Sequence, residues 1–435
     1  MGFVRSIGRW SLTGLIVNAI IGSSIFGLPS EITRLVGRAS PLAVLLGAMV
    51  ISLIVACMAE VASQFAEAGG PYLYVRTAFG RFAGLQVGWF WLLASMGGGA
   101  GCANLFVQYL ASIWPTAGHG IARIVIITAV IAIPGIVNYF GVRSGANLSN
   151  VLTVAKLLPL ILLIVVGLAH SSHPPGQVQV SASASTGWSA WLNAMLLLMF
   201  AYSGFENTLA PSGEVKEPRR TAPFALFTGL AICAVVYALI QYVTVATIGT
   251  RTSEYPLADT ASVLLGSFGV QLVATAVMIS TYGWLSGDIL ITPRVIYSFA
   301  ANGDAPAMLA QLHPRYHTPA PALLVYSILM WILAVTGTFL WVAAVGAASS
   351  LILYSGVCAS LIRLREVRPE APALRIPFGP VIAVLAIGIS LALISALDSR
   401  QALLMGLTAL LATANWWGAK RKANVERAAK MVVTS

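Results

Sequence analysis

Charged residues are scarce in this chain. Only 9% of its 435 residues are Asp, Glu, Lys or Arg, and 58% are hydrophobic, whereas soluble domains carry roughly 25% charged residues. Such a composition excludes an ordinary soluble domain and indicates a polytopic membrane protein. Acids are rarest: 14 Asp and Glu stand against 25 Lys and Arg, for a net charge of +11. We assign this excess to cytoplasmic loops, not to a nucleic-acid surface.

Cysteine and histidine are also rare and form no ligand pattern. The four cysteines lie singly in apolar segments, so we expect neither a disulfide nor a metal site. No P-loop pattern GxxxxGK[ST] occurs, which leaves ATP-driven transport without support. The buried polar residues offer no nucleophile–base or metal constellation. We therefore expect no cofactor and no enzymatic activity.

Long apolar runs, by contrast, are abundant. A membrane-spanning helix needs about 20 apolar residues, and counting such runs predicts an all-α protein with about twelve spans. The third and eighth are long enough to tilt strongly or to project beyond the bilayer. The predicted spans lie near 11–34, 40–66, 82–114, 120–138, 147–169, 188–212, 222–249, 260–299, 320–337, 340–363, 377–397 and 400–418.

The distribution of Lys and Arg predicts the orientation. With the amino terminus inside, nearly all of them are cytoplasmic, which satisfies the positive-inside rule. We therefore expect a multi-pass protein of the cytoplasmic membrane with both termini in the cytoplasm. The uncharged stretch 170–187 is then an external loop. Lys156 falls within a span, and the residues left outside are Arg34, Arg38, Arg123, Arg251 and Arg400.

Two spans contain residues that weaken a helix. The first contains Gly22-Ser23-Ser24, followed by Pro29, and the sixth contains Ser203-Gly204. An opened helix is tolerated at bilayer depth only where its backbone is buried in protein or lines a polar cavity. Taken alone, each sequence is equally typical of a small-residue packing face.

Together, the two breaks occupy matching places in two sets of five spans. An odd number of spans places the second set upside down in the membrane, so both breaks meet at the midplane. Half-helix N–H groups attract a carboxylate, and exposed carbonyls hold an ammonium. The pair therefore predicts a transporter site for a zwitterion.

Several stretches resemble the amino acid–polyamine–organocation permeases. The resemblance implies a LeuT-like fold, with a five-plus-five inverted repeat, broken helices 1 and 6, and two peripheral helices. It implies repeats at 1–169 and 188–365, peripheral helices at 377–419 and a basic cytoplasmic tail at 420–435. The stretches are IIGSSIFGLP, MAEVASQFAEAGGPYLYVRTAFG, NVLTVAKLLPL, FAYSGFEN, EVKEPRRTAP and ITPRVIYSFAANGDAP.

The resemblance also implies the substrate site. The carboxylate is expected at amides of the first break, and the ammonium at carbonyls of both breaks. Ser24 stands where the family commonly has glycine, and its hydroxymethyl group either narrows the backbone approach or supplies a donor. Phe205 is a candidate lid, and Tyr202 is left open between pocket and core. The expected substrate-binding residues are Ile20, Gly22, Ser23, Ser24, Phe200, Ala201, Tyr202, Ser203 and Phe205.

Lys156 and Asp288 are candidates for coupling. A charge at the depth of Lys156 costs several kcal/mol, and the similar apolar lengths on both sides disfavour snorkelling. In similar permeases without sodium coupling, a lysine here takes the place of sodium. We expect Lys156 to link the fifth span to carbonyls near Ala19–Gly22, as proton carrier or as fixed cation. We expect Asp288 to approach Lys156 or to share Ser286 or Ser24 with it.

The expected roles of the remaining residues concern gating, helix packing and loop contacts. Glu206 either gates the site and senses protons or caps the second half-helix. Gly97-Gly98-Gly99 is expected mainly to let the third span pack closely. A cytoplasmic loop network is expected from Glu60, Glu67, Arg76 and Arg81.

The sequence thus predicts a secondary active transporter that moves an amino acid by alternating access, proton-coupled and sodium-independent. Its expected partners are an amino acid or related amine, protons and the lipid bilayer, with no nucleic acid. Obligate exchange and polyamine transport stay open as alternatives, although only Glu206 and Asp288 could serve a polyamine. An amino-acid sensor is the alternative from another class, but the cytoplasmic segments are short for an output domain.

Overall fold

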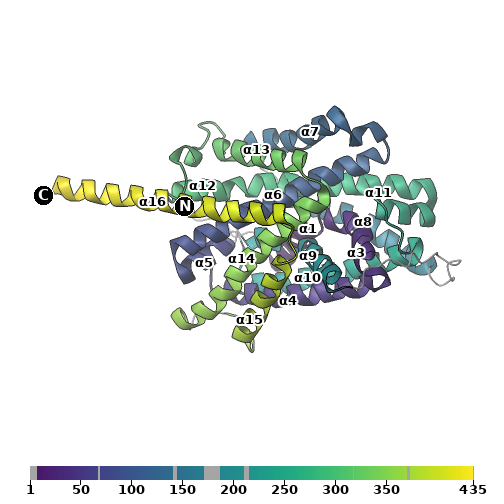
Figure 1. Cartoon of the computed structure of the whole chain (residues 1–435), viewed down its shortest axis with the longest axis horizontal. Helices are drawn as coiled ribbons and strands as arrows, with labels where there is room; N and C mark the ends of the chain where they lie inside the picture. Colours follow the sequence, from purple (N-terminus) through teal and green to yellow (C-terminus); the bar gives the residue numbers. More distant parts are fainter. Residues whose placement is uncertain are drawn as a thin grey trace.

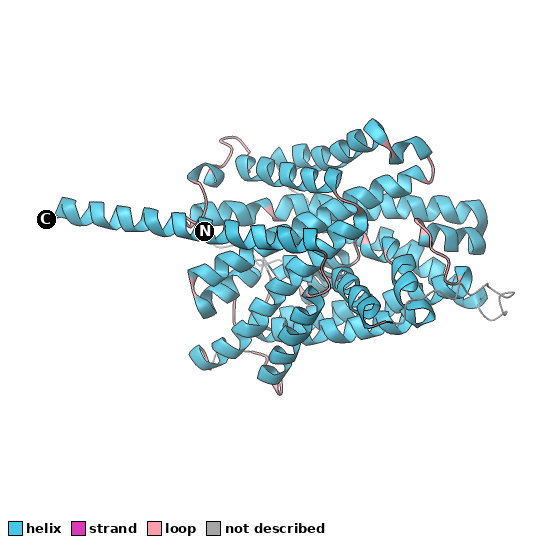
Figure 2. Ribbon diagram, in the orientation of Figure 1, coloured by secondary structure: helices cyan, strands magenta, loops and turns pink. Residues whose placement is uncertain are grey.

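The computed structural model describes residues 7–66, 69–140, 145–170, 187–209, 215–316, 318–369 and 373–434; for 145–154, 419 and 421–434 only the backbone is described. Within these ranges the chain forms helices and no strand, apart from one isolated bridge between Ile7 and Val215 (Figure 2). The all-α prediction is confirmed.

The helices gather into one bundle, from which the end of α16 projects (Figure 1). The first half contains α1 (Arg9–Ile20), α2 (Ser24–Gly27), α3 (Pro29–Val36), α4 (Ser40–Ala62), α5 (Gly70–Phe79), α6 (Arg81–Ala111), α7 (Gly120–Tyr139) and α8 (Gly145–His170). The second half contains α9 (Trp188–Tyr202), the 3-10 helix η3 (Phe205–Leu209), α10 (Pro218–Ile248), α11 (Pro256–Ile291), α12 (Pro293–Ala301), α13 (Ala320–Thr336), α14 (Phe339–Val367), α15 (Gly379–Ile394) and α16 (Ser399–Thr434).

Seven stretches of the described chain are long and apolar enough to cross a membrane. They are Arg9–Gly27, Pro29–Ala62, Arg81–Ala111, Gly120–Tyr139, Pro218–Ile248, Pro256–Ala301 and Phe339–Val367. Three shorter apolar helices cover Ala155–His170, Ala320–Thr336 and Gly379–Ile394. The predicted basic tail continues α16 as a helix to Thr434. The predicted external loop lies almost entirely outside the described residues.

The two helix breaks lie against each other. α1 ends at Ile20 and α2 begins at Ser24, while α9 ends at Tyr202 and η3 begins at Phe205. Gly204 has φ +106°, and a Cβ added to it would lie 2.5 Å from the carbonyl oxygen of Ala19. Both the backbone conformation and the close approach require glycine at this position.

Helices α6 and α14 pack together at the centre of the bundle. A Cβ added to Gly97 would lie 2.9 Å from the Cα of Gly346, so the two backbones approach as closely as small residues allow. The expected packing role therefore fits Gly97. Its neighbour Gly98 contacts a tryptophan of the cavity described below.

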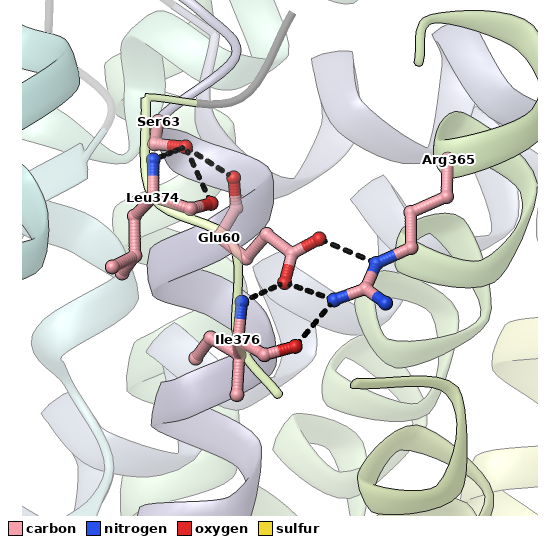
Figure 3. Close-up of polar contacts among 5 residues, drawn as sticks. All are labelled: Glu60, Ser63, Arg365, Leu374 and Ile376. Carbon is pink, nitrogen blue, oxygen red and sulfur yellow. Dashed lines mark hydrogen bonds and ion pairs between the residues drawn. The ribbon is translucent and has the colours of Figure 1, made fainter. Parts of the chain in front are cut away.

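A buried ion pair fastens the segment before α15 to α4 (Figure 3). Glu60 accepts two hydrogen bonds of 2.7 Å from Arg365 and one of 2.8 Å from the Ile376 N–H, and Arg365 also donates to the Ile376 carbonyl. We call Glu60, Arg365 and Ile376 the α4–α14 clasp.

The expected single loop network is divided in two. Glu60 belongs to the clasp, whereas Arg81 donates to Asp304. Tyr72 also donates to Asp304 at 3.2 Å, and Arg76 donates to Tyr72 at 2.7 Å. This second set joins α5 and α6 to the loop after α12, near the end of the bundle from which α16 projects (Figure 1).

Glu67, which was also expected in the loop network, lies outside the described residues. Arg365 and Asp304 were not predicted because they are hundreds of residues away in sequence.

Candidate functional site

A narrow cavity lies between the two breaks. The centre of a water-sized sphere can move through about 30 Å³ of it. The lining residues are Ala19, Ile20, Gly22, Ser23, Ser24, Ala94, Ser95, Gly98, Cys102, Phe200, Ser203, Gly204, Glu206, Asn207, Trp284 and Ser350.

Three consecutive N–H groups at the first break lack a backbone carbonyl partner. In the described part of the chain, no backbone carbonyl accepts from the N–H of Ser23, Ser24 or Ile25, although the Ser23 N–H faces the Cys102 thiol. The backbone bonds resume with Phe26 N–H to the Ser23 carbonyl at 3.2 Å. Ser23 and Ser24 line the cavity. Open N–H groups at a helix start attract an anion, so this wall can bind a carboxylate.

Lys156 contacts the first break from the side of α8. Its Nζ donates to the carbonyls of Asn18 at 2.9 Å and Ile21 at 2.6 Å, and the residue is 1% exposed. The sequence analysis expects Lys156 to link the fifth span to carbonyls near Ala19–Gly22, and both carbonyls lie in that region. The cation therefore satisfies acceptors that the break has left without helical partners.

Two further side chains occupy the remaining carbonyls at the end of α1. Trp284 of α11 donates through Nε1 to the Ala19 carbonyl at 2.9 Å. Tyr237 of α10 donates to the Ile20 carbonyl at 2.9 Å. Ile20 was expected to hold the substrate ammonium, but its carbonyl already has this partner.

Ser24 connects the two breaks. Its hydroxyl lies 3.4 Å from the Ala201 carbonyl and 3.3 Å from the Tyr237 hydroxyl. Of the two roles weighed for this residue, the hydroxyl therefore supplies a hydrogen bond, and it directs that bond to protein groups. Ala201 contributes its carbonyl to this contact and does not line the cavity.

The second break brings a carboxylate to the cavity. The Oε2 of Glu206 accepts from the Gly204 N–H at 2.9 Å and from the Tyr354 hydroxyl at 2.7 Å. Its neighbour Asn207 accepts at 2.5 Å from Nε1 of Trp91. On the same break, Ser203 donates its hydroxyl to the Phe200 carbonyl at 2.9 Å.

Two expected substrate contacts lie behind the lining. Phe205 stacks on Tyr354 with ring centroids 5.3 Å apart, is 1% exposed and does not reach the cavity. It packs η3 against α14 in place of the expected lid. Tyr202 donates to the Val44 carbonyl at 3.1 Å and therefore belongs to the core.

Asp288 and Lys156 have different partners. Asp288 is buried and accepts from Thr292 at 2.8 Å and from the Tyr326 hydroxyl. Among the described residues it forms no ion pair with Lys156. The expected partnership is replaced by hydroxyl donors from Thr292, which lies between α11 and α12, and from Tyr326 of α13. Ser286 also fails to connect them: it does not line the cavity, and its carbonyl accepts from Asn138 at 3.3 Å.

Trp284 is the main cavity residue that the sequence analysis did not single out. Its ring lies between two glycines: a Cβ would lie 3.3 Å from the ring at Gly22 and 2.6 Å from it at Gly98. The three residues are far apart in sequence. The glycines at positions 22 and 98 are visible in the sequence, but no spacing rule connects either of them with Trp284.

Comparison with known proteins identifies the family. A family model described as amino acid permease matches residues 7–414. The chain belongs to the amino acid permease family. This membership and the apolar helices together make it a multi-pass membrane protein.

Three relatives of this permease are named as amino-acid transporters or exchangers. It is 25% identical to the serine/threonine exchanger SteT of Bacillus subtilis over 433 residues, covering 97% of this chain and 98% of the relative. It is 26% identical to the glutamate/serine transporter AimA of Bacillus subtilis over 350 residues, 73% of this chain and 63% of AimA. It is 25% identical to cationic amino acid transporter 4 of Mus musculus over 397 residues, 86% and 62% of the two chains.

Proposed function

We propose that this permease is a secondary active transporter of a small neutral amino acid. The observation that carries the proposal is that the N–H groups of Ser23, Ser24 and Ile25 lack carbonyl partners beside a cavity that Ser23, Ser24 and the Glu206 carboxylate line. A carboxylate fits the amides, and the single lining carboxylate leaves no second acid for a cationic side chain. Small lining residues and a small volume favour a small substrate.

The named activities of two relatives agree with this substrate class. SteT is named a serine/threonine exchanger and AimA a glutamate/serine transporter. A polyamine is disfavoured because Asp288, the other acid considered for it, does not line the cavity.

We assign the chain a LeuT-like arrangement in the cytoplasmic membrane. Residues 1–169 and 188–365 form the two inverted repeats, 377–419 the peripheral helices, and both termini are cytoplasmic, with about twelve spans in total. Contact between the breaks at Gly204 and Ala19 supports this arrangement, since inverted repeats bring their interrupted helices together at the midplane. In such an arrangement transport proceeds by alternating access, in which one repeat rocks against the other around the site.

Lys156 makes the transporter sodium-independent in this proposal. Its ammonium occupies carbonyls on both sides of the end of α1, where a free cation would otherwise be needed. Proton coupling through Lys156 is our first assignment. Obligate exchange is the second, and it is favoured by the exchanger named among the relatives.

Ligand-dependent stabilisation of the purified protein tests the substrate class. Glycine, L-alanine, L-serine and L-threonine should raise the unfolding temperature, because a ligand that binds only the folded state stabilises it. L-Tryptophan, L-arginine and putrescine should have no effect at the same concentrations. Stabilisation by putrescine or L-arginine alone would contradict the proposed substrate.

A further inference from the structure

We propose that Glu206 binds the substrate ammonium and supplies its charged partner. The inference rests on the proposed function and names the second half of the same site. It follows from the hydrogen-bond partners of the acceptors around the cavity.

The carbonyls at the end of α1 all have protein donors. Lys156 occupies Asn18 and Ile21, as described above. Trp284 occupies Ala19, and Tyr237 occupies Ile20. Each of these donors is fixed by its own helix, so an ammonium would have to compete with an existing hydrogen bond.

Two carbonyls of the sixth-span break also have protein donors. The Phe200 carbonyl accepts from both the N–H and the hydroxyl of Ser203, at 3.2 and 2.9 Å. The Ala201 carbonyl faces the Ser24 hydroxyl at 3.4 Å and lies outside the lining. Within the described chain, no donor contacts the carbonyls of Gly22 and Ser203, and both residues line the cavity, so these neutral acceptors can share the ammonium with the Glu206 carboxylate.

Glu206 has one carboxylate oxygen that accepts from neither Gly204 nor Tyr354. Both of those donors bind Oε2, so the ammonium is placed at Oε1. The residue is 3% exposed, lines the cavity and belongs to none of the ion pairs in the described chain. A buried carboxylate without a cation is costly. A substrate ammonium would supply that cation and a charge-assisted hydrogen bond.

This assignment predicts how the site distinguishes an amino acid from its 2-hydroxy acid. The two ligands share the carboxylate and the side chain, so the amides of Ser23, Ser24 and Ile25 serve both. Only the amino acid presents a cation to Glu206. The ratio of hydroxy-acid Kd to amino-acid Kd therefore reports on the ammonium contact alone.

The test measures this ratio for purified full-length protein in nanodiscs. The probes are glycine, L-alanine, L-serine and L-threonine, each paired with glycolate, L-lactate, L-glycerate or the matching dihydroxybutanoate. Glu206→Gln should lower the ratio roughly tenfold to a hundredfold, as expected for losing a hydrogen bond to a charged group. The amino-acid Kd should rise while the hydroxy-acid Kd stays constant. Asp288→Asn removes a buried carboxylate outside the lining and should leave the ratio unchanged.

An unchanged ratio in Glu206→Gln would overturn the assignment, whether both Kd values stay at their wild-type levels or both rise by the same factor, as a gating or packing role would produce. If Glu206→Gln does not purify, Glu206→Asp replaces it; the shortened carboxylate should lower the ratio by a smaller factor, and an unchanged ratio would again overturn the assignment. Failure of the wild-type protein to bind any of the four amino acids would instead reject the proposed function itself.

Discussion

The Nζ of Lys156 lies 2.6 Å from the carbonyl oxygen of Ile21, at the point where the first membrane helix opens. A second bond reaches Asn18 at 2.9 Å. The lysine thus connects α8 to the break in α1. A change in the charge or position of Lys156 would therefore alter its hydrogen bonds to the backbone that leads to the amides of Ser23, Ser24 and Ile25.

Replacing Lys156 tests its part in coupling. Lys156→Ala leaves two buried carbonyls without donors, at about 1–3 kcal/mol each, and we expect uptake driven by a pH gradient to be lost. Proteoliposome uptake with an acidic exterior measures this. Lys420→Ala removes an exposed lysine of α16 and should keep full uptake. Intact pH-driven uptake in Lys156→Ala would contradict the role.

Gly204 is predicted to be irreplaceable. Gly204→Ala combines a positive φ with a Cβ 2.5 Å from the Ala19 carbonyl, so we expect the folded state to lose several kcal/mol, since backbone strain alone costs about 1–3 kcal/mol. Thermal unfolding in detergent measures the loss. Gly388→Ala, where a Cβ meets nothing within 4 Å, is the matched control and should be neutral or slightly stabilising. Equal unfolding temperatures for the two variants would show that the breaks do not touch as described.

Gly98 is predicted to position Trp284. A Cβ at Gly98 would lie 2.6 Å from the tryptophan ring, so Gly98→Ala should displace the ring and its hydrogen bond to Ala19. We expect amino-acid affinity to fall at least tenfold, a loss of about 1.4 kcal/mol. Gly101→Ala is the comparison, because its Cβ makes only ordinary contacts from 3.5 Å and should change affinity much less. If Gly98→Ala kept the wild-type affinity for the amino acid, the position of Trp284 would not matter for substrate binding.

The α4–α14 clasp is predicted to stabilise the folded protein. Glu60 is fully buried, and removing one partner of a buried pair costs about 3–5 kcal/mol, so Arg365→Met should lower the unfolding temperature markedly. Arg363→Ala is the control: Arg363 and Glu366 are paired at the surface, with side chains 52% and 62% exposed, where such pairs contribute at most about 1 kcal/mol. An equal effect of the two substitutions would show that burial does not matter here.

Substitutions of Ser24 test what the serine does at a position where the family commonly has glycine. Ser24→Gly removes the hydroxyl that lies between Ala201 and Tyr237 and widens the cavity by a hydroxymethyl group. We expect uptake of L-valine and L-leucine to rise relative to L-alanine. Ser24→Ala keeps the Cβ and should keep the wild-type preference; the same broadening in Ser24→Ala would assign selectivity to the hydroxyl instead of to the space.

The sequence predicted what depends on local chemistry. Glycine and serine pairs inside apolar runs identified both breaks, and an isolated lysine at bilayer depth identified a residue that needs buried acceptors. These signals are visible because lipid tolerates so few polar groups.

The sequence could not predict contacts between distant helices. Nothing near Trp284 or Tyr237 indicates that each occupies a carbonyl of α1, so the ammonium was expected at Ile20. For the same reason Asp288 was paired with Lys156, although hydroxyls of Thr292 and Tyr326 satisfy it. Helix rotation decides such contacts, and an apolar helix with little amphipathic character does not reveal its rotation.

Uptake by purified protein in liposomes tests the central claim most directly. Radiolabelled L-alanine, L-serine and L-threonine are supplied outside, with a proton gradient, a sodium gradient or internal unlabelled amino acid as the only driving force. The account predicts uptake with the proton gradient and none above background with sodium alone; uptake only with internal amino acid would select exchange. Absence of amino-acid uptake under all three conditions would contradict it.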